Sequence, residues 1–131
     1  MGSPVPGCSL ALGSPLNTDP LPDYFVKAEL RIGWTTVDSL EAAEKLSCQL
    51  VESGLAACVQ IESLVGSVYR WEGEVRQVPE WRLVVKFVAA KGAEIEALIE
   101  AQHPYECPQW IVLRPESVSD RYLAWVTGSH L

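Results

Sequence analysis

The fold of this chain is decided by residues 55–88, which read LAACVQIESLVGSVYRWEGEVRQVPEWRLVVKFV. Two runs rich in β-branched and aromatic residues flank the pair Glu72-Gly73, where glycine tolerates the positive φ that a hairpin turn requires. Pro79 has no N–H for a strand ladder, so it must lie at a sheet edge or a bulge. The stretch therefore predicts one long β-hairpin.

The predicted hairpin is long for a domain of this size. Each arm holds about 15 residues and would extend ~50 Å at ~3.3 Å per residue, whereas a compact domain of about 100 residues has a radius of gyration of ~13 Å. The hairpin should therefore overhang its core, and the apolar overhang needs another strand edge to cover it, which predicts a cyclic homo-oligomer. The expected subunit interface is formed by Val68, Tyr69, Trp71, Val75 and Trp81. The alternative is a hairpin that breaks at Gly66 and Pro79 and folds back on its own sheet.

One strand and one helix are predicted before the hairpin. Residues 24–34 alternate apolar and polar side chains, as a half-buried strand does. Residues 35–54 carry apolar side chains at helical spacing, and Asp38 followed by Glu41 is typical of a capping box. Gly54 stands where a helix ends in the left-handed conformation. These residues predict a β-α unit ahead of the hairpin.

A helix, a short strand and a last helix are predicted after the hairpin. The second helix covers residues 91–102, a short buried strand covers 110–115, and the last helix lies within 117–128 with Ser119 as its expected cap. The complete order is β-α-β-β-α-β with an added C-terminal helix. This is the ferredoxin-like pattern of the α+β class.

Length and composition limit the organisation and the partners of the chain. Its 131 residues suffice for one domain, in which residues 1–23, rich in Pro, Gly and Ser, predict a disordered leader and residues 24–131 the folded part. The net charge of -7 argues against a nucleic-acid partner, because binding phosphates requires clustered Lys and Arg. No apolar run reaches the ~20 residues that span a bilayer, and no basic start precedes an apolar stretch as in a secretory signal. We therefore expect a cytoplasmic protein without a membrane span.

Several segments occur in one order with consistent spacing: TTVDSLEAAEKL, VESGLAACVQI, SVYRWEGEV, EWRLVVKF, HPYECP and YLAWV. Together they resemble the CutA family of divalent-cation tolerance proteins over residues 30–126. The resemblance implies a ferredoxin-like subunit in a tight homotrimer whose long hairpins pair between subunits. It also implies a similarity to the trimeric nitrogen-regulatory signalling proteins, which bind small ligands in intersubunit clefts. It also implies a role in tolerance of copper or another divalent cation, without an established reaction. The chain departs from the family pattern at Gln60, at Phe87 and in residues 114–120, all around the expected cleft.

The resemblance makes a set of polar and aromatic residues candidates for that ligand cleft. Glu80 and Lys86 lie an even number of residues apart on one predicted strand and so point to one face. Aromatic side chains with polar tips serve both pockets and interfaces, so packing within the trimer is the alternative for the aromatic members. The candidate cleft residues are Trp71, Glu80, Lys86, His103, Tyr105, Tyr122 and Trp125.

His103 is one of 2 histidines in the chain, and it lies in HPYECP where a helix is predicted to end. Imidazole binds Cu(II) or Zn(II), and Cys58 on a strand could add a thiolate, so the candidate metal site is formed by these two residues or by the same residue from several subunits. No C-x-x-C or other paired ligand spacing accompanies them. The competing interpretations are a helix end enforced by Pro104 for His103 and a buried packing role for Cys58.

Sequence signals for catalysis are weak. The chain contains no G-x-S-x-G, no phosphate-binding P-loop and no G-x-G-x-x-G. Cys107 and His103 are conceivable as a nucleophile and its base, but the neighbouring prolines oppose a preorganised pair. We therefore expect no enzyme. The preferred hypothesis is a trimer that binds a divalent metal or small ligand at intersubunit clefts. The second hypothesis is a trimeric scaffold or signalling protein that engages a protein partner. The third is an enzyme that uses Cys107 or His103.

Overall fold

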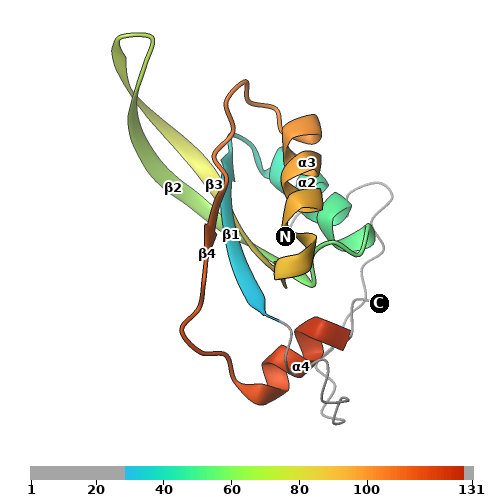
Figure 1. Ribbon diagram of the computed structural model, residues 1–131. Helices are drawn as coiled ribbons and strands as arrows, with labels where there is room; N and C mark the ends of the chain where they lie inside the picture. The colour runs from blue at the N-terminus through green and yellow to red at the C-terminus, as the bar shows by residue number, and fades with distance from the viewer. Residues whose placement is uncertain (1–28, 129–131) are drawn as a thin grey trace.

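The computed structural model describes residues 29–128, and its elements follow the predicted order (Figure 1). The elements are β1 (Leu30–Val37), α2 (Leu40–Glu52), β2 (Cys58–Trp71), β3 (Glu74–Val88), the short 3-10 helix η1 (Ala89–Lys91), α3 (Gly92–Gln102), β4 (Ile111–Leu113) and α4 (Asp120–Gly128). The predicted leader and the first residues of the predicted strand 24–34 lie outside the described residues. None of the described helices is long and apolar enough to cross a membrane. The predicted ferredoxin-like α+β class is confirmed.

The strands form one antiparallel sheet in the order β2-β3-β1-β4. β1 pairs with β3 along its whole length, from Leu30 opposite Val88 to Val37 opposite Trp81. The short β4 pairs with the other side of β1. Helices α2 and α3 lie on one face of this sheet, and α4 lies near the end of the sheet where β1 begins (Figure 1).

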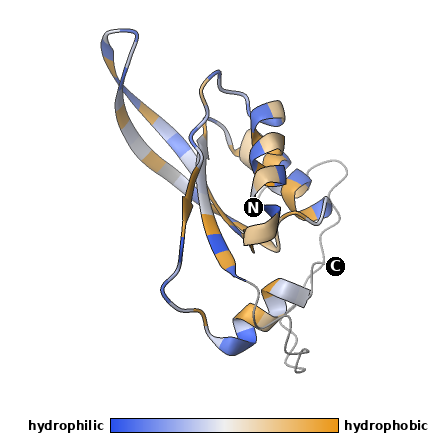
Figure 2. Cartoon of the chain, viewed as in Figure 1, coloured by the Kyte–Doolittle hydropathy of each residue, from blue (hydrophilic) through white to orange (hydrophobic). Residues whose placement is uncertain are grey.

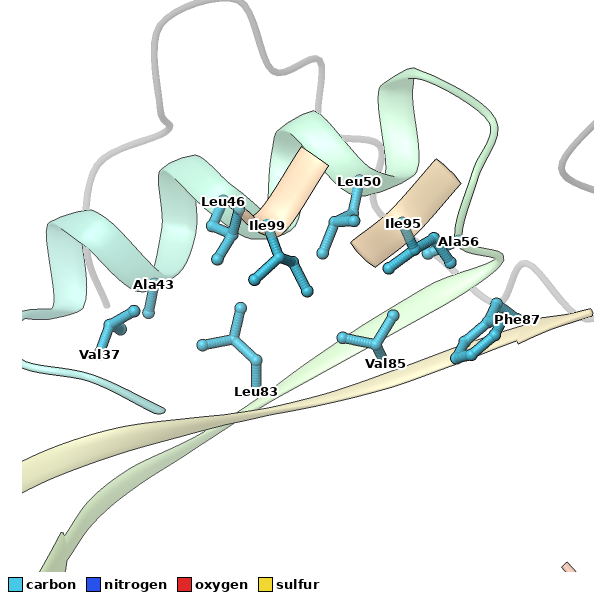
Figure 3. Close-up of a cluster of buried hydrophobic side chains, with 10 residues drawn as sticks. All are labelled: Val37, Ala43, Leu46, Leu50, Ala56, Leu83, Val85, Phe87, Ile95 and Ile99. Carbon is cyan, nitrogen blue, oxygen red and sulfur yellow. The ribbon is translucent and has the colours of Figure 1, made fainter. Parts of the chain in front are cut away.

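The hydrophobic core lies between the sheet and helices α2 and α3 (Figure 3). Leu83, Val85 and Phe87 alternate along β3, and each is at most 1% exposed. Burying a side chain of this size contributes about 1.5–3 kcal/mol, so this short run stabilises the contact between sheet and helices strongly. The other members of the cluster are Val37, Ala43, Leu46, Leu50, Ala56, Ile95 and Ile99.

The start of helix α2 differs in two details from the sequence prediction. Residues 35–37 were expected in the helical segment but belong to β1, where they are buried and pair with β3. The N-cap is Ser39 rather than Asp38, because the Ser39 hydroxyl oxygen accepts the N–H of Ala42 at 3.1 Å. At the other end Gly54 has a φ of 78°, in agreement with the predicted left-handed helix terminus.

The β2–β3 hairpin extends beyond the rest of the subunit, as predicted (Figure 1). Its turn residues Glu72 and Gly73 have φ values of 50° and 81°, which are typical of a type I′ hairpin turn. Residues 65–71 of β2 pair with β3 past the point where β1 ends, so the overhang measures roughly 20 Å at ~3.3 Å per residue. The pairing continues through Gly66 opposite Pro79, so the alternative of a hairpin that breaks there is wrong.

β4 is an exposed edge strand, whereas the sequence predicted a buried one. Ile111, Val112 and Leu113 are 46%, 45% and 37% exposed. The reason is that, among the described residues, β4 has a neighbour on one side only. The hairpin overhang also carries exposed apolar residues interleaved with polar ones (Figure 2), among them Val68 and Val75 at 64% and 65% exposed. The subunit therefore presents apolar strand residues on both its overhang and its β4 edge.

Candidate functional site

A cavity of about 650 Å³ lies where the overhanging hairpin faces the segment that follows α3. Its carboxylates come from three places in the chain: Asp38 beyond β1, Glu80 on β3 and Glu106 after α3. Arg76 on β3 is the cation among the lining residues. The other lining residues are Thr36, Ser67, Val68, Tyr69, Trp71, Val78, Tyr105, Cys107 and Gln109. This excess of acidic over basic groups favours a cationic or neutral polar ligand over an anionic one.

The cavity wall formed by residues 104–109 begins at the end of α3. His103 is the C-cap of this helix, with extended φ and ψ of -71° and 137°, and its N–H still bonds to the carbonyl oxygen of Ile99 at 2.9 Å. Pro104 follows, and a proline pushes the residue before it away from the helical conformation. The predicted helix end at His103 is therefore confirmed, and the chain then passes the end of β1 on its way to β4.

The imidazole of His103 ties this segment to β1. It is only 9% exposed, and its Nε2 lies 2.9 Å from the carbonyl oxygen of Thr36 and 3.1 Å from the hydroxyl oxygen of Thr35. Its Nδ1 lies 3.0 Å from the backbone nitrogen of Tyr105, which donates to it. Because a carbonyl oxygen can only accept, Nε2 carries the proton and Nδ1 is bare. The ring is thus the neutral Nε2–H tautomer with both nitrogens engaged.

The ionisation of His103 is opposed by its surroundings. Burial lowers the pKa of His103 below its usual value of 6.5, because the charged imidazolium would lose its hydration. The hydrogen bond to Thr36 and the charges of Asp38, Glu80 and Glu100 act in the opposite direction without cancelling the effect of burial on the pKa. At neutral pH the neutral ring is therefore the stable form.

Tyr105 connects His103 to the cavity. Its ring packs edge-on against the imidazole, with centroids 4.9 Å apart, and its hydroxyl donates to a carboxylate oxygen of Glu80 at 2.6 Å. Burial and the bond to Glu80 both raise the pKa of Tyr105, so the phenol keeps its proton. Since Glu80 is only 5% exposed, this hydrogen bond holds a nearly buried carboxylate at the edge of the cavity.

The candidate cleft residues divide into two groups in one subunit. Trp71, Glu80 and Tyr105 line the cavity, and His103 lies directly behind Tyr105. The other members are Tyr122 and Trp125 on α4 and Lys86 beside this helix. Nζ of Lys86 is 5.2 Å from the ring centroid of Tyr122, whose ring is 5.8 Å from that of Trp125. The separation follows from strand geometry, because Glu80 and Lys86 are roughly 20 Å apart along β3 at ~3.3 Å per residue.

The structure does not bring the candidate metal ligands His103 and Cys58 together. Cys58 is opposite Lys86, which is opposite Ile32, whereas His103 bonds to Thr35 further along β1. The offset is about 10 Å along the sheet in addition to the spacing between strands. No three His, Cys, Asp or Glu side chains within residues 29–128 gather closely enough to hold a metal ion. One subunit therefore offers no complete set of metal ligands in its described part.

Cys107 lines the cavity as an exposed free thiol. The ring nitrogens of His103, its conceivable base, bond instead to Thr35, Thr36 and Tyr105. The two side chains are therefore not arranged as a nucleophile hydrogen-bonded to its base.

The expected interface residues differ in their surroundings. Those on the overhang, Val68, Tyr69, Trp71 and Val75, are exposed in the subunit. Trp81, in contrast, packs against the core of its own subunit. Among the hairpin side chains whose burial the structure describes, the large exposed apolar ones thus lie on the overhang.

Sequence reasoning missed several cavity residues. Asp38 was interpreted as a helix cap, and Arg76 and Glu106 carried no signal of their own. Their place at the cavity depends on the register of the strands and on the path of the chain after α3, so no local pattern in the sequence marks them. The missed residues supply most of the charge in the cavity.

Comparison with known proteins places this architecture in a family. Residues 32–129 match the family model described as CutA1 divalent ion tolerance protein. The divalent-cation tolerance protein CutA of Thermus thermophilus is 37% identical over 91 residues, which cover 70% of this chain and 88% of that protein. The chloroplastic protein CutA of Arabidopsis thaliana is 36% identical over 96 residues, which cover 73% of this chain but 53% of that protein. The match thus spans about half the length of this plant relative.

Solved structures agree with these relatives. The crystal structure of the divalent ion tolerance protein CutA1 from Ehrlichia chaffeensis has a TM-score of 0.77 and 30% identity, and covers 80% of this chain and 98% of its own. The divalent cation tolerance protein of Thermus thermophilus has a TM-score of 0.71 and 35% identity, with 74% and 94% of the two chains covered. Since the family model, relatives above 30% identity and the fold all agree, the chain belongs to the CutA1 family of divalent ion tolerance proteins.

Proposed function

We propose that this chain acts in divalent metal tolerance as a homotrimer that binds a divalent cation, copper foremost, or a small polar ligand at clefts between subunits. The observation that carries the proposal is the cavity under the overhanging hairpin, with carboxylates from three parts of the chain on its lining. Relatives named divalent-cation tolerance proteins support the class of ligand.

The exposed strands support assembly. The overhang carries Val68, Tyr69, Trp71 and Val75, each at least 37% exposed, and the β4 edge carries three further exposed apolar residues. Two different exposed edges on one subunit suit a head-to-tail contact, which closes into a ring when the rotation between subunits allows it. In such a ring the hairpin of one subunit would cover the edge of the next, and the cavity would gain a wall from the neighbour.

The cation would be shared between subunits in this proposal. The described part of one chain supplies carboxylates to the cavity, but it gathers no set of three metal-binding side chains. Hard divalent cations prefer oxygen ligands, whereas copper also accepts nitrogen and sulfur, so the exposed thiol of Cys107 at the cavity wall suits copper. A second subunit would have to complete the coordination.

We further propose that the protein binds rather than catalyses, and that it is cytoplasmic. Both ring nitrogens of His103 are engaged in hydrogen bonds, so it has no free lone pair to activate Cys107. Relatives are named chloroplastic, and one solved relative is named periplasmic, so cell fractionation is the direct measurement of location.

Native mass spectrometry of the untagged full chain, purified without added metal or chelator, is the first test. A trimer that carries an added mass supports the proposal and identifies the bound species by its mass. A monomer would refute a site between subunits.

Titration calorimetry with Cu(II) then tests the cavity itself. Asp38→Asn and Glu106→Gln each remove one charge from the lining and should weaken binding about tenfold, or ~1.4 kcal/mol. Glu94→Gln changes an exposed carboxylate in the first turn of α3 that does not line the cavity, so it is the matched control and should bind as the wild type does. Equal affinity in all variants would place the copper elsewhere.

A trimeric scaffold or signalling protein is the second candidate. It is favoured by the exposed apolar residues of the overhang, which a protein partner could cover. A bare trimer that takes up no copper and keeps Val68 and Val75 open to limited chemical labelling would favour this candidate over the first.

A further inference from the structure

We propose that His103 makes the wall of the cavity sensitive to pH, because protonation of its imidazole breaks the hydrogen bond that holds residues 104–109 against the end of β1. The effect on a bound ligand rests on the function proposed above, whereas the release of the segment can be measured on the ligand-free protein.

The geometry makes the imidazole a two-sided connection. On one side its Nε2–H donates to the carbonyl oxygen of Thr36 at 2.9 Å, and on the other its bare Nδ1 accepts the backbone N–H of Tyr105 at 3.0 Å. The ring is 9% exposed, so solvent cannot easily replace either partner. The turn after α3 thus depends on one unprotonated nitrogen.

Protonation reverses the role of that nitrogen. A proton on Nδ1 turns an acceptor into a donor that faces the N–H of Tyr105, and two donors at this distance cannot bond. A flip of the ring does not help, because both nitrogens of the imidazolium are donors. The backbone at Tyr105 must therefore move away from the ring or the segment must rearrange around it.

The charges around the ring lower the cost of this change without removing it. Asp38 beyond β1, Glu80 on β3 and Glu100 on α3 all favour the imidazolium, while burial opposes it. From α2, Lys45 lies with Pro104 along a neighbouring groove. The neighbouring acidic groups offset part of the cost of placing a charge in a buried position, so the ring can be protonated without unfolding of the domain.

The movement would reach the cavity through Tyr105. Its hydroxyl donates to Glu80 at 2.6 Å, and the following residues Glu106, Cys107 and Gln109 line the cavity. When the backbone of Tyr105 moves, its bond to Glu80 is strained or lost and this part of the lining shifts. Acid would therefore open the cavity through His103 and Tyr105.

Two measurements on the full chain test the proposal directly. Nitrogen-15 NMR of histidine-labelled protein, with His130→Asn to remove the other histidine signal, should show the Nε2–H tautomer at pH 7.5 and a midpoint below 6.5. Hydrogen–deuterium exchange of residues 104–109, corrected for the intrinsic effect of pH, should become about tenfold faster (~1.4 kcal/mol) with the same midpoint. An Nδ1–H tautomer, or exchange that stays constant while the ring titrates, would overturn the proposal.

Two variants distinguish the contribution of His103 to the pH response from that of the carboxylates. His103→Gln keeps an amide donor and acceptor but does not titrate, so its exchange should be flat between pH 7.5 and 5. Glu80→Gln keeps an acceptor for Tyr105, so the response should persist, with its midpoint moved to lower pH because one charge that favours the imidazolium is gone. A response that disappears in Glu80→Gln and persists in His103→Gln would assign the sensitivity to Glu80 and refute the role of His103.

Two further readouts keep the test decisive. If His103→Gln fails to fold, the agreement of the exchange midpoint with the imidazole midpoint carries the test, and different midpoints would refute the role of His103. Tyr105→Phe retains the backbone bond to His103 and should keep the exchange response while it loses the bond to Glu80. Copper affinity at pH 7.5 and 5.5 tests the link to ligand separately. A protein that binds no copper but shows the exchange change would refute the proposed copper site and leave the pH response standing.

Discussion

Removing the hydroxyl of Tyr105 should destabilise the protein far more than its size suggests. The Tyr105→Phe change deletes one oxygen atom, but that hydroxyl donates at 2.6 Å to Glu80, a carboxylate that is only 5% exposed. A hydrogen bond to a charged group contributes about 1.5–3 kcal/mol, and a buried charge left without its donor costs at least as much. We therefore expect the free energy of unfolding at pH 7 to fall by about 1.5–3 kcal/mol.

Equilibrium unfolding in guanidinium measures this change, with all variants at one protein concentration. Tyr69→Phe is the matched control, because Tyr69 lines the same cavity and has no hydroxyl hydrogen bond among the described residues; it should change stability by less than about 0.5 kcal/mol. In a Glu80→Gln background the loss caused by Tyr105→Phe should shrink to about 1 kcal/mol, as expected for a neutral acceptor. If Tyr105→Phe and Tyr69→Phe are alike, or if Glu80→Gln leaves the loss unchanged, the Tyr105–Glu80 bond does not hold the carboxylate.

Three further predictions concern the core, a close contact and pH. Leu83→Ala empties a fully buried position on β3 and should cost about 2–5 kcal/mol in guanidinium unfolding, and a smaller loss would mean that the core collapses to fill the space. Gly33→Ala would drive a Cβ into the ring of Trp110 and should lower the free energy of unfolding by about 1–3 kcal/mol. Gly66→Ala is the control, because its Cβ meets no atom within 4 Å and stability should hardly change. Equal losses of stability in the two variants would contradict the close contact between Gly33 and Trp110. Folding lowers the pKa of His103, so the unfolded chain takes up a proton at a higher pH than the folded chain does. The stabilisation by the neutral His103 ring is therefore complete above about pH 6.5 and is lost as the pH falls below that value. Unfolding at pH 7.5, 6.5 and 5.5 should show a steeper loss for wild type than for His103→Gln, and parallel curves would contradict this.

The hairpin and the helix-facing side of β3 could be predicted from the sequence because they are set by local chemistry. Glu72-Gly73 supports a tight turn, and the alternation of Leu83, Val85 and Phe87 predicts one buried face. The end of β1 could not be located in the same way. Residues 35–37 suit a strand or the start of a helix, and only their pairing with β3 decides between the two.

The dependence on contacts far apart in the sequence also explains why β4 was predicted to be buried and why several cavity residues were missed. An apolar run indicates burial in the assembled protein, but it does not say whether the cover comes from the same chain, and β4 is exposed in the isolated subunit. The hydrogen bond from Tyr105 to Glu80, which continues the contact from His103, joins residues 25 positions apart. Its donors and acceptors depend on the register of β3 and on the path of the chain after Pro104, neither of which has a local signature.

The overhanging hairpin also has a consequence for the newly synthesised chain. Beyond the end of β1 the hairpin has an unpaired β-edge with exposed apolar residues, the kind of segment from which aggregates grow. Its sequence places Arg70 and Arg76 beside Glu72 and Glu74 around the tip, and such charges act as gatekeepers that disfavour irregular stacking of strands. Neutralising them should lower the yield of soluble protein more than it lowers the stability of the folded chain, because these charges act mainly while the chain is newly made and its apolar residues are open to other copies.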